Sequence, residues 1–137
     1  MTLANGTHAV NALLDANNAS YQGGIGLDIE VRSQGQVKII KLRGRLSLGE
    51  PCDRLRATLE DLLRAGDNRQ ILDLGELATM DSSGIGLLAR FLTSAKQTGG
   101  SLKLVNPSKF VLQTLKLVGL LNLFEIFTDS ESAVASF

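Results

Sequence analysis

The fold class is set by residues 70–105, which read QILDLGELATMDSSGIGLLARFLTSAKQTGGSLKLV. Gln70–Leu74 is a short, mostly apolar run of the kind found in strands that are buried on both faces. Apolar residues then recur at helical spacing from Ile85 to Ala95, and Gly99-Gly100 ends that pattern. Ser101–Val105 is a second strand. A strand, a helix and a strand in this order predict a right-handed crossover between parallel strands.

The segments on either side extend the same sheet. Residues 27–32 and 37–43 alternate apolar and polar side chains around a short turn, so they predict an antiparallel hairpin. We expect a helix that begins at Glu50-Pro51, a loop over 75–81, and a last strand over 123–127. Further helices are expected after Ser108 and after Asp129, each following a capping residue. The predicted fold is α/β, a mixed sheet of antiparallel N-terminal strands followed by parallel strands. It carries about four helices in the order ββαβαβαβα.

The length of 137 residues suits one domain. We place this domain at residues 27–137, where the regular patterns are found. Residues 1–26 are rich in Ala, Asn and Gly, and we interpret them as a mobile N-terminal arm.

Composition excludes several classes of function. Lys+Arg and Asp+Glu both total 14, and a net charge of zero argues against nucleic acid as a direct ligand. No apolar run reaches about 18 residues, so we expect no membrane span. The single cysteine, Cys52, allows no internal disulfide and fits a reducing compartment, which predicts a cytoplasmic protein.

Motifs for enzymatic chemistry are scarce. The one histidine, His8, makes both a zinc site and a Ser-His-Asp triad improbable. Gly84–Ala89 fits the dinucleotide motif G-x-G-x-x-A, but about nine residues separate it from the strand that ends at Leu74. No acidic residue follows about twenty positions later, as that motif requires. We therefore expect small residues that let a helix pack on the sheet, and we expect no enzymatic activity and no deep ligand pocket.

Asp81-Ser82-Ser83-Gly84 joins the expected loop to the start of a helix. Asp and Ser can cap a helix there by accepting hydrogen bonds from free backbone N–H groups. An exposed serine at this place would also accept a phosphate, which adds about −1.5 to −2 charges. The N-terminus of a helix favours an anion, so a phosphate would change the surface without unfolding the domain. The pattern alone leaves both readings open, a cap only or a phosphorylation switch.

The segment Met80–Gly86 with the following Gly99–Leu104 closely resembles the bacterial anti-sigma factor antagonists, members of the STAS domain family. Ile71–Leu74 and Val118–Phe124 resemble further elements of that family, in the same order, over about residues 28–137. The family works by partner switching. An unphosphorylated antagonist binds an anti-sigma factor that is also a serine kinase, phosphorylation breaks the complex, and a serine phosphatase restores the antagonist.

The resemblance implies that Ser82 is the phosphoacceptor and that Asp81, Ser83 and Gly84 support it, with Ser83 at or near the helix cap. It also implies an anti-sigma factor serine kinase and a serine phosphatase as partners. The kinase supplies ATP and magnesium, so the chain needs no cofactor of its own. The residues expected to contact the partner are Ser47, Thr79, Met80, Arg90 and Ser94.

One loop departs from the family pattern. Well-matched antagonists commonly read G-E-L-D where this chain reads Gly44-Arg45-Leu46-Ser47. The change favours an alternative function, a STAS interaction or scaffold module that regulates a non-sigma partner. Ser47–Glu50 also has the form of a capping box, so Ser47 is either a contact residue or a helix cap.

Overall fold

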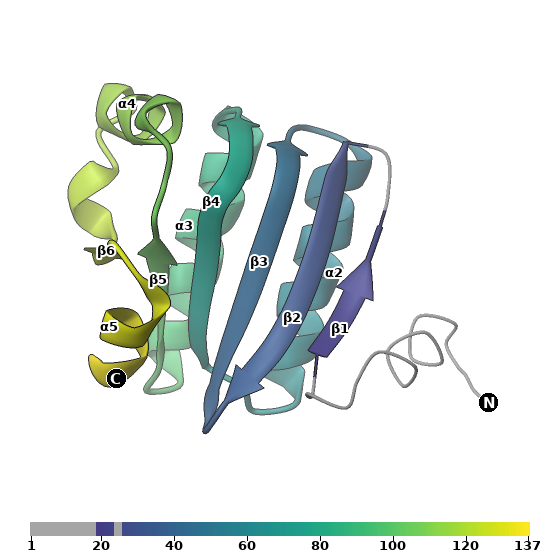
Figure 1. Ribbon diagram of the computed structural model, residues 1–137, viewed down its shortest axis with the longest axis vertical. Coiled ribbons are helices and arrows are strands. Elements are labelled where there is room, and N and C mark those ends of the chain that lie inside the picture. The colour runs from purple at the N-terminus through teal and green to yellow at the C-terminus, as the bar shows by residue number, and fades with distance from the viewer. Residues whose placement is uncertain (1–18, 24–25) are drawn as a thin grey trace.

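A computed structural model describes residues 19–23 and 26–137, which form a six-stranded sheet in the order β1-β2-β3-β4-β5-β6 (Figure 1). The strands are β1 Ala19–Gln22, β2 Leu27–Gln34, β3 Val37–Leu46, β4 Arg69–Met80, β5 Ser101–Val105 and β6 Ile126–Phe127. The helices are α2 Glu50–Arg64, α3 Ser82–Gln97, α4 Lys109–Leu117 and α5 Ser130–Ala135, with a 3₁₀ turn, η1, over Leu121–Leu123.

Strands β1, β2 and β3 pair antiparallel, and β3, β4, β5 and β6 pair parallel. Each parallel pair is joined through a helix, α2, α3 or α4, because a parallel connection must cross the sheet before it returns. The mixed sheet predicted from the sequence is therefore confirmed.

The two faces of the sheet differ. Helices α2 and α3 lie behind the sheet in Figure 1, and with α4 they bury the main hydrophobic core. On the opposite face α5 covers a smaller apolar cluster near β5, which includes Ile39, Ile71 and Val105. Among the helices of the described residues, none is long and apolar enough to cross a membrane.

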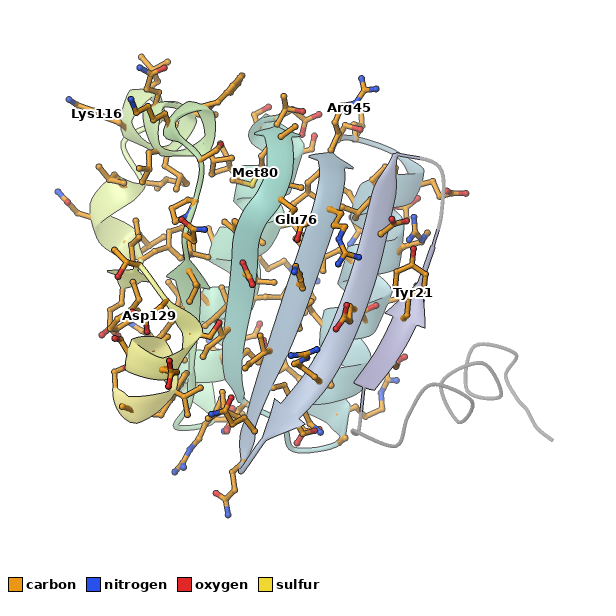
Figure 2. All side chains as sticks on the ribbon, in the orientation of Figure 1. Tyr21, Arg45, Glu76, Met80, Lys116 and Asp129 are labelled. Carbon is orange, nitrogen blue, oxygen red and sulfur yellow. The ribbon has the colours of Figure 1, made fainter. Side chains whose placement is uncertain are left out.

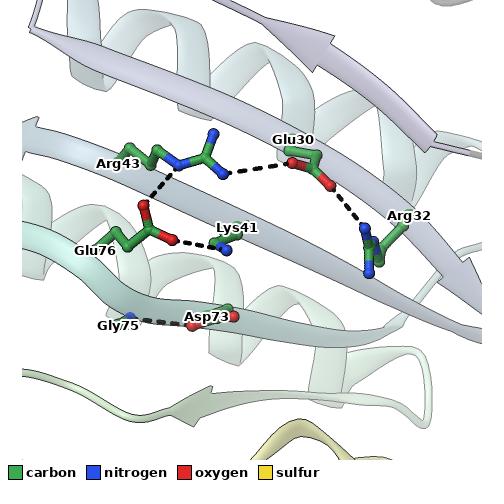
Figure 3. Close-up of polar contacts among 7 residues, drawn as sticks. All are labelled: Glu30, Arg32, Lys41, Arg43, Asp73, Gly75 and Glu76. Atoms are coloured by element: carbon green, nitrogen blue, oxygen red, sulfur yellow. Dashed lines mark hydrogen bonds and ion pairs between the residues drawn. The ribbon is translucent and has the colours of Figure 1, made fainter. Parts of the chain in front are cut away.

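The rest of that opposite face is charged (Figure 3). Glu76 accepts a hydrogen bond from Arg43 Nε at 2.7 Å and pairs with Lys41 Nζ, also at 2.7 Å. Hydrogen bonds from Lys41 and Arg43 lower the pKa of the Glu76 carboxyl. Glu30 links the same Arg43 to Arg32. These groups neutralise one another, as expected for the solvated face of a partly antiparallel sheet.

The expected loop over residues 75–81 is wrong, because β4 continues to Met80. Its second half pairs with the end of β3, and two register shifts accommodate Gly75 and its neighbours. Leu77 and Met80 are buried there, so apolar burial holds this part of the chain in the sheet. Gly75 interrupts the mostly apolar run of Gln70–Leu74, which is why the sequence predicted a strand that ends at Leu74.

The two ends of the sheet also differ from expectation. Ala19–Gln22 lies within the expected arm but pairs with β2, with Tyr21 opposite Glu30. The rest of the arm, 1–18 and 24–25, lies outside the described residues. The last strand is shorter than the expected 123–127: Leu121–Leu123 forms η1, Phe124 turns into the core, and only Ile126–Phe127 pairs with β5.

Candidate functional site

Strands β3 and β4 end at the same edge of the sheet, and α3 begins there. Figure 2 shows Arg45 and Met80 at this end of the molecule. The register places Arg45 opposite Thr79 and Leu46 opposite Met80. The chain then passes from β4 through one residue, Asp81, into α3, so this residue sets the geometry of the site.

Asp81 is the N-cap of α3, with extended backbone at φ −90° and ψ −178°. Its Oδ1 accepts a hydrogen bond from the N–H of Gly84 at 3.0 Å, which satisfies one free donor of the helix. Its Oδ2 accepts from the N–H of Leu48 at 2.9 Å, and its own N–H donates to the carbonyl of Leu46 at 3.2 Å. One carboxylate therefore joins the start of α3 to the loop after β3. Ser83 is the second residue of the helix, which agrees with the expectation that it lies at or near the cap.

Ser82 is the first residue of α3 and is exposed. Within the described part of the chain its hydroxyl makes no hydrogen bond, because Asp81 already provides the cap. Ser83 is half-buried. The arrangement thus presents the exposed hydroxyl of Ser82 at the N-terminus of a 16-residue helix, where an added anion is electrostatically favoured.

Gly84 explains how the helix reaches the sheet. A Cβ at this position would lie 2.9 Å from Cγ of both Leu46 and Met80, so only glycine fits without displacement. A Cβ at Gly86 would meet nothing within 4 Å. The sequence reading of small residues that let the helix start pack on the sheet therefore applies to Gly84 alone.

The other predicted contact residues differ in how far their side chains are exposed. Met80 is only 2% exposed, so the expectation that its side chain contacts a partner is wrong; it packs in the core. Thr79 and Ser47 are half-buried beside the site. Arg90 is exposed and Ser94 half-buried on α3, with Arg90 about 12 Å along the helix from its start.

The expected capping box at Ser47 is also wrong. Helix α2 has Gly49 as its N-cap and no side-chain hydrogen bond at that end. The carbonyl of Ser47 accepts from the N–H of Cys52 at 3.3 Å instead, and Gly49 has a positive φ of 100° that suits glycine. Ser47 therefore keeps its hydroxyl free at the edge of the site.

The sequence also predicts partner contacts along residues 44–49, although it does not single out Arg45 or Leu48 among them. Leu48 is 76% exposed, and Arg45 is exposed at the end of β3. A cavity of about 400 Å³ lies beside them, lined by Gly26, Arg45, Ser47, Glu50 and Pro51. A leucine inside a short polar loop was the available signal, since such a position is normally polar.

The site offers little for catalysis. Cys52 is buried, and burial together with the Asp81 carboxylate raises the pKa of its thiol, which disfavours the reactive thiolate. Among the described residues no group of His, Cys, Asp and Glu could hold a metal ion. The group that the site does present to solvent is the exposed hydroxyl of Ser82.

Several known proteins are similar to this chain in sequence or in fold. The anti-sigma-B factor antagonist of Bacillus subtilis (strain 168) is 34% identical over 80 residues, 58% of this chain and 72% of the relative. The solved structure of the anti-sigma factor antagonist SpoIIAA in its unphosphorylated form has a TM-score of 0.70 at 24% identity, covering 79% of this chain and 94% of that one. The phosphorylated form of SpoIIAA, a Bacillus cell fate determinant, has a TM-score of 0.64 at 23% identity, covering 79% and 97%.

The solved structures share the fold, and the sequence comparison gives the family. Residues 28–133, most of the chain, match the STAS domain. The chain belongs to the STAS domain family, and its relatives include anti-sigma factor antagonists.

Proposed function

We propose that this protein is an anti-sigma factor antagonist that acts by partner switching. The unphosphorylated form binds a serine-kinase anti-sigma factor, and phosphorylation of Ser82 releases it. The observation that carries the proposal is the free, exposed hydroxyl of Ser82 at the start of α3, beside a cap that Asp81 supplies. A relative that shares the fold has been solved in a phosphorylated form, which supports a domain that tolerates the modification.

The proposed switch works by charge at a fixed surface. A phosphate on Ser82 adds about −1.5 to −2 charges beside the Asp81 carboxylate. The N-terminus of α3 stabilises that anion, so the fold persists while the surface seen by the partner changes. The contact surface comprises Ser82 with Ser47, Thr79, Arg90 and Ser94. In this proposal the protein is a non-enzymatic cytoplasmic regulator, the kinase supplies ATP and magnesium, and a serine phosphatase resets the cycle.

The test is incubation with the cognate kinase and ATP, followed by intact-mass measurement. Wild-type protein and Ser83→Ala should each gain one phosphate, and Ser82→Ala should gain none. Ser82→Asp should weaken binding to the anti-sigma factor at least tenfold, about 1.4 kcal/mol. Modification that persists in Ser82→Ala would refute the assignment of the phosphoacceptor.

A second function has one observation in its favour. Arg45 at the end of β3 and Ser47 directly after the strand stand where well-matched antagonists carry acids, so the same fold would present a different charge to its partner. This favours a STAS interaction or scaffold module with a non-sigma target. Gene neighbours discriminate the two, since an adjacent kinase or phosphatase gene favours partner switching.

A further inference from the structure

Leu48 is an exposed apolar side chain on a fixed backbone. It is 76% exposed, yet its N–H donates to Asp81 Oδ2 at 2.9 Å. Leu46, two residues before Leu48, is fully buried, and its carbonyl accepts a hydrogen bond from the N–H of Asp81. The following Gly49 accepts from Asp53 N–H in the first turn of α2. A leucine held in this way loses little backbone entropy when a partner covers it, as suits an anchor residue.

Within residues 19–23 and 26–137, Arg45 is a cation without a partner at the same edge. Every other arginine in the described residues makes a side-chain hydrogen bond, ion pair or ring contact. The Arg45 guanidinium makes none, and it lines the cavity of about 400 Å³ beside Leu48. Its backbone is fixed, since its N–H donates to the carbonyl of Gly26 at 2.7 Å. An unpaired guanidinium on a fixed strand end favours a carboxylate in bidentate geometry.

We propose that Leu48 and Arg45 determine which partner this protein accepts. The contact surface of the partner offers an apolar socket for Leu48 and an Asp or Glu for Arg45. This inference rests on the proposed function, because it takes the occupant to be the anti-sigma factor that meets Ser82. It also explains how a phosphate acts: placed one residue from Asp81, the phosphate repels the partner's carboxylate and competes for Arg45.

A competing surface lies on α4. Leu117 is 86% exposed and Phe110 is 47% exposed, with Lys109 and Lys116 beside them. The Leu48 surface is favoured because the hydrogen bond from Leu48 N–H to Asp81 makes it continuous with Ser82, whereas no hydrogen bond or ion pair joins α4 to Asp81 or Ser82 in the described residues. The two exposed leucines therefore form a matched pair for an experiment.

The experiment measures the dissociation constant of the purified anti-sigma factor kinase for four variants. Leu48→Ser and Arg45→Glu should each bind about tenfold more weakly than wild type. The loss in Arg45→Glu should shrink at high salt, because the lost contact is ionic. The controls are Leu117→Ser and Arg64→Glu. Arg64 lies at the far end of α2, and its side chain is 74% exposed. Both controls should stay within about twofold of wild type, and circular dichroism should show all four variants folded.

The outcomes separate the two proposals. If Ser82 is still phosphorylated but Leu48→Ser and Arg45→Glu bind like wild type, the proposal that Leu48 and Arg45 determine partner choice is overturned. The proposed function is not affected by that result. An equal loss in Leu117→Ser would move the contact to α4 and also overturn it. If wild-type protein binds no anti-sigma factor at all, the proposed function fails and this inference fails with it.

Discussion

Replacing Asp81 by Ala tests whether one carboxylate supports both the helix and the loop. The change removes the hydrogen bond from Gly84 to Oδ1 and the one from Leu48 to Oδ2. Loss of an N-cap costs about 1 kcal/mol, and loss of a hydrogen bond to a charged acceptor at an exposed site costs about 1 kcal/mol more. We therefore expect the free energy of unfolding to fall by about 2 kcal/mol.

The assay is equilibrium unfolding in urea, with the slope m unchanged so that the midpoint reports stability. Ser108→Ala is the matched control, because Ser108 caps α4 through a single bond to Val111 N–H and ties no loop. It should cost about 1 kcal/mol. Asp81→Asn should also cost about 1 kcal/mol, since Asn can still cap the helix but offers only one acceptor oxygen and loses the bond from Leu48. Equal losses in Asp81→Ala and Ser108→Ala would refute a contribution from the bond to Leu48.

Two further predictions concern packing and pH. Gly84→Ala should lower stability by about 1–3 kcal/mol, because its Cβ would overlap side chains at the ends of β3 and β4, whereas Gly86→Ala should raise it by up to about 1 kcal/mol. Urea unfolding of both variants measures this, and equal effects would contradict the close approach at Gly84. Hydrogen bonds from Lys41 and Arg43 lower the pKa of Glu76, so its contribution to stability is present above the unfolded value of about 4.3 and is lost as pH falls through the lower folded pKa. The stability difference between wild type and Glu76→Gln should therefore shrink as pH falls below about 4, and a difference constant with pH would contradict it.

The sequence predicted the strands and helices best where apolar residues recur at a regular spacing. The alternation in residues 27–32 and 37–43 predicted the hairpin, and the helical spacing from Ile85 to Ala95 predicted α3. Ala19–Gln22 was missed because the four residues ASYQ are too short a run to stand out in a stretch rich in Ala, Asn and Gly, and pairing with β2 supplies what the local sequence does not. The length of β4 was missed because its second half depends on the end of β3, which lies far away in the sequence.

The candidate site was predicted in part for a similar reason. Asp, Ser and Thr all cap helices, so residue type alone did not separate Asp81 from Ser83; the backbone angle where α3 begins does. Met80 directly precedes the exposed Asp81 and Ser82, and only the arrangement of β3 against α3 shows that it is buried. The position of the Leu48 backbone likewise depends on its hydrogen bond to Asp81, a contact between residues 33 positions apart.

The lengths of the outer strands have a consequence for how the protein associates. The two strands at the ends of the sheet, β1 and β6, are the shortest, with four and two residues. Short edges expose few unpaired backbone groups, so they give another chain little to extend as a continuous sheet. The short edges therefore limit the pairing of this sheet with other copies of the chain. Under the proposed function, the reversible contacts lie instead at the loops beside Ser82, where phosphorylation would break them.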